Sequence, residues 1–409
     1  DCLRGIVQFV RTQLAISILV EGFLEWMRWR NARASASKST ARRPATRAAE
    51  VLTVFSLLTA MLMPLVHTGR PWRTVSWIYT LPFVPYDYAR GIWPNIRSPL
   101  VWDPSAVGTY LIASSLFVFI ALIPDLAVIR DRAVNPLVKK IYGTMCLGWR
   151  GTPRQWKLQA VAGILLSALV LPVFVSVHSI VSWDFAVLIG VEGWHSTIFA
   201  PYFIIGAIHS GVSAVAMLMA LSVWLWGLDK YLRPDHFDAI GRLLIVVATT
   251  WFFFFFLEWV FALYTLEGVE ISLRELQVFQ WPYGMLFLIF LATAFFIPVP
   301  MWMFKSVRRS AFWMFFTTVL VNVGMWLERF LIIIPGLARR QPFTFDWGTY
   351  HPSIIEILIV AETFAFVALG MLLFSKFFPL IPIFDIKEGM VVRDEIKIGR
   401  RIVPATIRE

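Results

Sequence analysis

Long apolar segments alternate with short polar segments along almost the whole chain. A helix of about 20 apolar residues spans the hydrocarbon core of a bilayer. Backbone groups cannot remain unpaired in lipid, and the sequence lacks the ten-residue alternation of a membrane barrel, so these segments are predicted to be helices. We predict about nine transmembrane helices, near residues 6–27, 48–66, 105–124, 158–178, 199–226, 239–264, 281–300, 311–334 and 354–378.

The composition supports this all-α polytopic membrane protein. The 409 residues are 58% hydrophobic and only 15% charged, whereas an ordinary soluble domain is about 45–50% apolar and about 25% charged. The formal charge of +11 needs no nucleic acid, because basic cytoplasmic loops account for it. A soluble basic stripe with interleaved aromatic residues is absent from the sequence, so we expect no nucleic-acid partner.

Lysine and arginine are concentrated in every second connection. The basic segments lie near 28–47, 130–157, 230–242, 305–309 and 387–401, whereas 179–198 has neither residue. The positive-inside rule places the basic connections in the cytoplasm. Cys2 and Cys146 are too few for an iron–sulfur cluster or a structural zinc site, and we expect no disulfide.

Two further features concern the first quarter of the chain. The sequence begins at Asp1 without Met, so we expect native residues, including a further helix, to precede it. The outer connection 67–104 is rich in proline and aromatic residues, as in "WIYTLPFVPYDYARGIWPNIRSPLVWD". A loop of this size and composition is expected to be ordered and to cover a site or dock a partner.

Five titratable residues are predicted to gather at the outer face: His67, Asp103, His178, Asp184 and His195. Each taken alone is equally well explained as a helix cap or an interfacial anchor. Together they suit proton-coupled redox chemistry, because a quinol loses two protons as its electrons leave. An imidazole with an ordinary pKa of about 6.5 accepts one proton, and a carboxylate orients the imidazole or takes the other.

Three glutamates lie within apolar runs and are candidates for a proton path: Glu258, Glu328 and Glu362. Ionisable residues in the membrane are costly and are functional candidates for that reason. The alternative is that Glu258 and Glu362 are buried, protonated carboxyl groups. Glu328 and Arg329 form either part of such a path or a structural ion pair at a helix–helix contact.

Haem is disfavoured by the distribution of histidines. A b-type cytochrome needs histidine pairs at matched depth on facing helices. His67 and His178 are predicted on the same side of the membrane, so one haem near the outer face remains an alternative. A second haem near the cytoplasmic face would need another histidine pair, and only His236 lies near that side. We expect His209 to be a packed interior residue, and His236 and His351 to lie in loops. Phosphate-binding, H-E-x-x-H and G-x-S-x-G motifs are absent from the sequence.

Several motifs resemble, in the same order, a quinol-oxidising membrane subunit of bacterial alternative complex III, within the NrfD/PsrC polysulfide reductase membrane-subunit family. They include "HTGRPW", "WPNIRSPLVWD", "LIPDLAVIRDRA", "LGWRGTPRQW", "SVHSIVSWDFA", "GWHSTIFAPYFIIGAIHSG" and "NVGMWLERFLII". The resemblance runs from about residue 50 to "FPLIPIFDIKEG". The stretch 1–49 matches poorly, and the loop between His67 and Asp103 is longer than the family pattern.

The resemblance implies two four-helix bundles with flanking helices, ten helices in the full chain. On this basis we expect a first bundle over 1–178, including the ordered outer loop 67–104. A second bundle is expected over 179–334, and a final transmembrane helix with a cytoplasmic tail over 335–409.

The same resemblance implies that menaquinol or ubiquinol is oxidised at the outer face of the bacterial inner membrane. His67, Asp103 and Asp184 match the family's quinol site, and Arg70 and His178 are expected to line the same pocket. Electrons are expected to pass to an iron–sulfur subunit docked on the outer face and then to multihaem and monohaem cytochrome c subunits. A paralogous NrfD-like membrane subunit and lipids are the other expected partners. No haem or metal is implied in this subunit.

Two other functions remain open at this point. One is a quinone-reducing membrane anchor of a molybdopterin oxidoreductase, which runs the same site in reverse. The other is a secondary transporter with the intramembrane carboxylates as its ion path. Transporters often break helices at the midplane, and Pro172 and Pro298 fit that pattern. The ionisable cluster lies at the membrane edge instead, which favours quinol chemistry.

Overall fold

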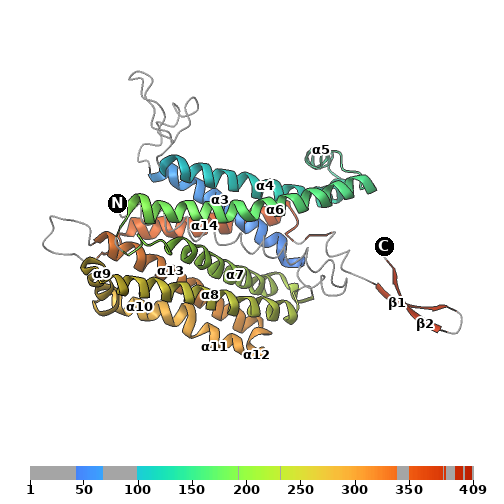
Figure 1. Cartoon of the computed structure of the whole chain (residues 1–409). Helices are drawn as coiled ribbons and strands as arrows, with labels where there is room; N and C mark the ends of the chain where they lie inside the picture. The colour runs from blue at the N-terminus through green and yellow to red at the C-terminus, as the bar shows by residue number, and fades with distance from the viewer. Residues whose placement is uncertain are drawn as a thin grey trace, which may run out of the picture.

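The computed structural model describes residues 43–67, 99–191, 193–230, 232–338, 350–380, 382–383, 392–398 and 401–407. Long helices dominate this part of the chain (Figure 1). The α-helices are α3 (Arg43–His67), α4 (Pro99–Arg132), α5 (Pro136–Met145), α6 (Pro153–Trp183), α7 (Phe199–Trp226), α8 (Pro234–Thr265), α9 (Gly268–Phe279), α10 (Tyr283–Leu291), α11 (Pro298–Met303), α12 (Lys305–Arg308), α13 (Ala311–Ala338) and α14 (Ile354–Phe377). Two π-helices, η5 (Asp184–Ile189) and η7 (Ala292–Phe296), and a 3₁₀ turn, η6 (Leu228–Lys230), complete the helical set.

Seven helical segments of the described residues are long and apolar enough to cross a membrane, and the protein is a multi-pass membrane protein. They are Trp102–Arg132, Pro153–Ile189, Phe199–Leu225, Pro234–Thr265, Tyr283–Met303, Ala311–Leu337 and Ile354–Phe377. Each overlaps one predicted span, so the predicted fold class is confirmed. The count is lower than the predicted nine. The span expected at 48–66 falls within α3, which is not among the seven, and the span at 6–27 lies outside the described residues.

The tail contains a small element that the sequence did not predict. Strands β1 (Val392–Ile398) and β2 (Arg401–Ile407) form an antiparallel hairpin in which Val392 pairs with Ile407. The hairpin projects away from the helices (Figure 1).

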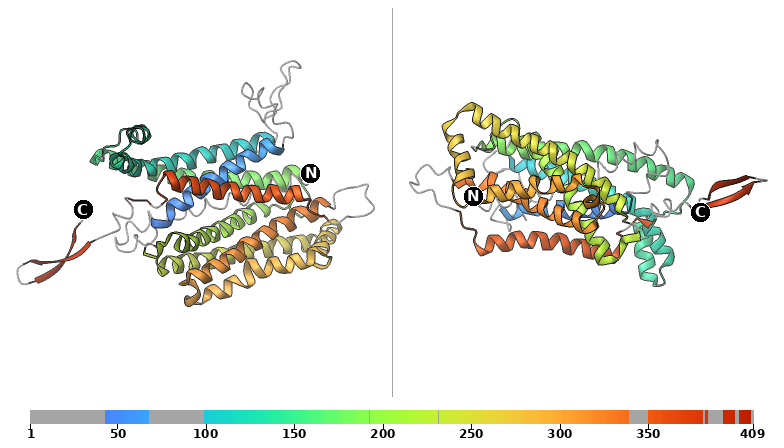
Figure 2. Two further views of the ribbon diagram at one scale, coloured as in Figure 1. Left: turned by 180° about the vertical axis from the view of Figure 1, so that it is seen from behind. Right: turned by 90° about the horizontal axis from the view of Figure 1, so that it is seen from below.

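The long helices lie side by side in two groups. The first helix group contains α4, which packs on both α3 and α6, and α14, which packs on α3. The second helix group contains α7, α8, α10 and α13, and contacts between α6 and α7 join the groups. The views in Figure 2 show the same grouping, with α14 along one side of the molecule. Helix α9 lies at one end of the long helices and α5 and α12 at the other, hereafter the α9 end and the α5 end.

Glycine permits a close backbone approach between α13 and η7 in the second group. A Cβ atom on Gly324 of α13 would lie 2.6 Å from the backbone nitrogen of Ala294. Ala294 belongs to η7, where the wider π-helical turn bulges toward α13. Any larger residue at 324 would have to separate the two helices.

The structure corrects the prediction that Arg47 belongs to a basic cytoplasmic loop. Arg47 lies in the first turns of α3 and is buried. Its Nη1 donates to the Asp125 carboxylate at 3.0 Å, and its Nη2 donates to the Ala121 carbonyl at 3.0 Å. Glu50 lies 3.7 Å from the same guanidinium. Burial with two carboxylates makes Arg47 a structural link between α3 and α4.

His236 is also placed differently from the prediction. It lies in the first turn of α8 and is buried, not in a loop. Its Nδ1 accepts a hydrogen bond from the Arg233 backbone N–H at 2.8 Å. His236 therefore helps to cap α8, which begins at Pro234.

Candidate functional site

Three of the five predicted outer-face residues are buried at the α9 end of the first helix group. Asp103 lies in the first turns of α4, and Asp184 follows directly after α6. Helices α4 and α6 pack together, so the start of one lies beside the end of the other (Figure 1). Asp103, His178 and Asp184 are 6%, 2% and 1% exposed. Such burial is unusual for interfacial anchors, which keep their polar atoms in water.

His178 lies six residues before Asp184, roughly 9 Å deeper along α6 at 1.5 Å per residue. Its Nδ1 lies 3.0 Å from the Phe174 carbonyl, and its ring centroid lies 4.2 Å from that of Phe174. The carbonyl is an acceptor, so it selects the tautomer with a proton on Nδ1. Nε2 is buried and has no hydrogen-bond partner among the described residues. In this tautomer Nε2 carries no proton, and its lone pair is available as a hydrogen-bond acceptor.

Asp184 begins the π-helix η5, which extends α6 to Ile189. Gly190 ends this turn with a φ of +53°, and its N–H donates to the Phe185 carbonyl at 3.0 Å. π-Helical turns inside or at the end of α-helices are frequent at functional sites, because the extra residue changes the direction of the side chains. Phe185 packs edge-on against Trp194 with ring centroids 5.3 Å apart. The turn is thus fixed against the loop that precedes α7.

His67 and Arg70 are only partly covered by the structure. His67 is the last residue of α3, but the placement of its side chain lies outside what is described. Arg70 and the loop through residue 98 also lie outside the described residues. The predicted roles of His67, Arg70 and the ordered loop 67–104 therefore stay predictions.

Glu328 is the centre of a buried polar group in the second helix group. Its Oε1 accepts hydrogen bonds from the Tyr202 hydroxyl and from Trp251 Nε1, the latter at 2.9 Å. Its Oε2 lies 3.6 Å from Arg329 Nη1. Glu328 and Arg329 thus form an ion pair within α13, and a role of Glu328 in a proton path stays a prediction. Three helices, α7, α8 and α13, meet at this carboxylate.

Arg329 faces the boundary between the helix groups. Its guanidinium lies 4.3 Å from the centroid of the Phe203 ring, a cation–π contact. A Cβ on Gly206 would lie 2.7 Å from Arg329 Nη2, so glycine makes room for the side chain. The Phe203 ring centroid lies 6.3 Å from that of Phe185 in η5, so this contact lies where the second helix group meets the first.

Glu258 lies at the α9 end of the second helix group. The buried carboxylate accepts a hydrogen bond from Ser196 Oγ at 2.5 Å and lies 3.6 Å from Arg274 Nη2. Arg274 also binds Glu270 at 3.1 Å, and its guanidinium lies 4.8 Å from the Trp259 ring centroid. Glu258 and Glu328 therefore lie in the same helix group, at different depths.

Further polar contacts continue from Glu328 toward the α5 end. His209 is fully buried, as predicted, and its Nε2 lies 3.1 Å from the Ala294 carbonyl of η7. Asn322 Nδ2 donates to Ser213 Oγ at 3.0 Å. At the α5 end, Arg308 Nε donates to Asp238 at 2.8 Å. We call the series Glu258, Glu328, His209, Asn322 and Asp238, with the residues that bind them, the polar row.

Glu362 does not belong to the polar row. It is exposed on α14. The residues around it belong to the same helix and are apolar: Ile355, Leu358, Ile359, Ala361 and Ala365. The structure therefore brings Glu258 and Glu328 into one helix group and leaves Glu362 on a surface that faces lipid or a partner.

Sequence reasoning did not identify several residues of these sites. Tyr202 and Trp251 resemble ordinary apolar or interfacial residues in a sequence, and Ser196 carries no charge. Arg274 lies in a segment between two predicted spans, where a single arginine indicates no site. Glu270 and Arg274 are four residues apart, a spacing that predicts an ion pair on one face of a helix, as is found on α9.

The family described as "Polysulphide reductase, NrfD" matches the chain over residues 17–340. The match includes α3 to α13, and with them Asp103, His178, Asp184 and the polar row, whereas α14 lies beyond it. No curated protein matches the sequence.

Proposed function

Because the chain belongs to the NrfD polysulphide reductase family, we propose that it oxidises quinol at the α9 end, as the quinol-oxidising subunit of an alternative complex III. Members of this family are quinone-interacting membrane subunits of redox enzyme complexes and act beside iron–sulfur and other redox subunits. A bacterial inner membrane is consistent with this family and with the seven spans. What we propose beyond the family is that the chain oxidises quinol, and that it does so in an alternative complex III.

The observation that carries the proposal is the burial of Asp103, His178 and Asp184 at one end of the first helix group. The positive-inside rule predicts that this end is the outer face. A quinol headgroup there gives up two protons and two electrons and becomes the quinone. We propose that His67 accepts one proton from a quinol hydroxyl, and that Asp103 and Asp184 hold the headgroup and carry protons outward. Arg70 and His178 line the same pocket.

The electrons need carriers outside the chain. We propose that they pass to an iron–sulfur subunit docked at the α9 end and from there to multihaem and monohaem cytochrome c subunits. The paralogous NrfD-like membrane subunit packs beside this chain. Menaquinol and ubiquinol both suit a site of imidazole and carboxylate groups.

The decisive experiment replaces His67 by alanine in the assembled complex. We expect quinol-dependent cytochrome reduction to fall at least about 100-fold, as is typical for loss of a general base, while the subunits still co-purify. The matched control is His351→Ala, because His351 is exposed ahead of α14. Full activity in His67→Ala rejects the site.

The composition of the purified complex separates the rivals. Multihaem cytochrome c supports quinol oxidation, whereas a molybdopterin subunit supports the quinone-reducing alternative. A secondary transporter would move its solute in vesicles without any quinol.

The polar row supports a second part of the proposal, which is that quinol oxidation drives proton movement through the second helix group. Glu328→Gln keeps an oxygen for the Tyr202 and Trp251 donors but cannot carry a proton. We expect proteoliposomes with this variant to oxidise quinol while moving fewer protons per electron. Glu275→Gln, an exposed change on α9, is the control. An unchanged proton-to-electron ratio in Glu328→Gln rejects the path.

A further inference from the structure

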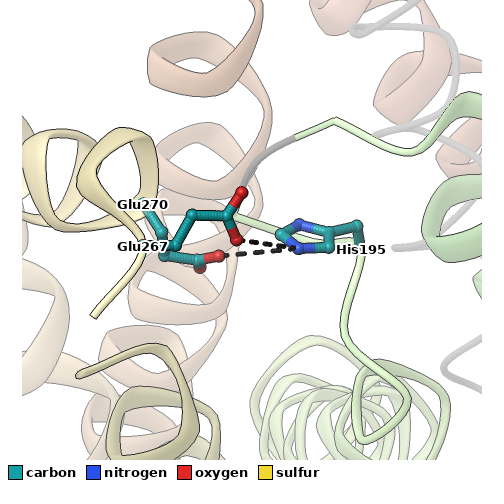
Figure 3. A group of neighbouring side chains, drawn as sticks. All are labelled: His195, Glu267 and Glu270. Atoms are coloured by element: carbon teal, nitrogen blue, oxygen red, sulfur yellow. Dashed lines mark ion pairs between the residues drawn. The ribbon is translucent and has the colours of Figure 1, made fainter. Parts of the chain in front are cut away.

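A histidine and two glutamates gather at the α9 end of the second helix group, apart from the residues assigned to quinol. His195 lies in the loop before α7, Glu267 is the N-cap of α9, and Glu270 lies in its first turn. His195 Nε2 lies 3.9 Å from Glu267 Oε2 and 3.8 Å from Glu270 Oε2. One donor atom from each residue lies within 4.8 Å of the other two. Figure 3 shows both carboxylates turned toward the imidazole.

The backbone beneath this cluster is fixed. Gly193 has a φ of +93°, and a Cβ there would lie 2.6 Å from Leu273 Cδ2. The loop therefore packs directly on α9 through the buried Leu273. This contact holds His195, two residues further along the loop, beside the first turn of α9.

Glu270 is held in position by a second interaction. It is 5% exposed, and its Oε1 accepts a hydrogen bond from Arg274 at 3.1 Å. Its other oxygen, Oε2, faces His195. A carboxylate that is buried and fixed through one oxygen presents the other in a defined direction, as the supporting residues of metal ligands do.

The charges around the cluster do not balance. Glu258, Glu267 and Glu270 supply three carboxylates, and Arg274 contacts two of them, Glu258 and Glu270. Arg274 is the one arginine or lysine in this set of five side chains. The set therefore carries an excess negative charge that a divalent cation would neutralise.

We propose that His195, Glu267 and Glu270 bind a divalent transition-metal ion of the Zn²⁺ class. Zinc bonds to imidazole nitrogen and carboxylate oxygen at about 2.0–2.2 Å, which places tetrahedral donors about 3.4 Å apart. The two nitrogen–oxygen distances of 3.8 and 3.9 Å are close to that value. His195 and Glu267 are exposed, so small side-chain rotations bring their donors into range.

The donor set favours this class of metal. Imidazole nitrogen suits zinc, copper, iron and nickel, whereas calcium and magnesium prefer oxygen donors alone. Three protein donors leave a fourth tetrahedral position for water or a ligand. The other explanation of the cluster is a plain ion pair between protonated His195 and the two glutamates, which needs no metal.

Zinc binding to the purified full-length protein, in detergent or within its complex, separates the two explanations. We expect a site that competes with a chelating dye, and we expect His195→Ala and Glu267→Gln each to weaken it at least tenfold. Both residues are exposed, so these variants should fold. His351→Ala and Glu275→Gln are matched controls that leave the affinity unchanged.

Cobalt gives an independent readout, because bound Co²⁺ reports its ligands by visible absorption. We expect that absorption in the wild type, and we expect it to be absent from Glu267→Gln. Equal zinc affinity in the variants and the controls, or no site below about 100 μM in the wild type, overturns the proposal. These measurements use no quinol, so their outcome is independent of the proposed function.

Discussion

The two helix groups bury polar residues in different ways, although both are built from long antiparallel spans. In the first group, Asp103, His178 and Asp184 lie toward the α9 end, and a separate ion pair of Arg47 with Asp125 lies near the α5 end. In the second group, the polar row continues from Glu258 at the α9 end to Asp238 at the α5 end.

The carboxylates of the second group are held by side chains of other elements. Glu258, Glu328 and Asp238 each accept hydrogen bonds in this way. Each group also buries one histidine nitrogen that has no hydrogen-bond partner in the described part of the chain, Nε2 of His178 in the first and Nδ1 of His209 in the second. An unpaired buried polar atom is costly, and His178 lies on the helix that leads to Asp184, where a ligand would supply the missing partner. The hydrogen-bonded carboxylates of the second group suit structure or proton transfer.

The largest expected effect tests the ligand site. Asp184→Asn keeps the shape of the side chain but removes its charge and its ability to take a proton. We expect quinol-dependent cytochrome reduction to fall by about 10²–10⁴-fold, the usual range for acid–base groups. Asp131→Asn, an exposed change at the α5 end of α4, is the control. If both variants keep wild-type rates, Asp184 has no part in the chemistry.

The next effect concerns stability at the α5 end of the first group. Asp125→Ala leaves Arg47 buried without its 3.0 Å partner, which typically costs about 3–5 kcal/mol. We expect a clearly lower thermal unfolding midpoint in detergent. Asp131→Ala removes the exposed partner of Arg130 and should cost at most about 1 kcal/mol. Equal shifts would show that the Arg47 pair is not a structural link.

A smaller effect is expected where α13 packs closely on η7 in the second group. Gly324→Ala places a Cβ 2.6 Å from the Ala294 nitrogen, and overpacking of this kind costs about 1–3 kcal/mol. Gly163→Ala is the control, because a Cβ at that position of α6 meets nothing within 4 Å. We expect the control to be neutral or slightly stabilised, since alanine favours helix. The same thermal measurement compares the two variants.

The hydropathy of the chain was enough to predict the spans. Seven of the predicted runs overlap helices of membrane-spanning length and composition, because burial in lipid requires nearly continuous apolar sequence. The alternation of basic connections predicted that Asp103 and Asp184 lie at one end. That result depends only on the direction of successive helices, which the chain order fixes.

The rotation of each helix could not be predicted in this way. A span that is apolar on all sides gives no sign of which face meets its neighbours. For that reason the contact of Tyr202 and Trp251 with Glu328 was not foreseen. His236 was wrongly placed in a loop because Pro234 was not recognised as the first residue of α8. Local turn chemistry, and not hydropathy, decided that position.

The smallest expected effect concerns Glu362, which the sequence grouped with Glu258 and Glu328. It lies eight residues into α14, roughly 12 Å from the start of the helix, and its side chain is exposed among apolar residues of that helix alone. No member of the polar row belongs to α14. We expect Glu362→Gln to leave quinol oxidation, the proton-to-electron ratio and the unfolding midpoint unchanged within error. A lower ratio, measured beside Glu328→Gln in the same proteoliposomes, would extend the proton path to α14 and remove the contrast between the two helix groups.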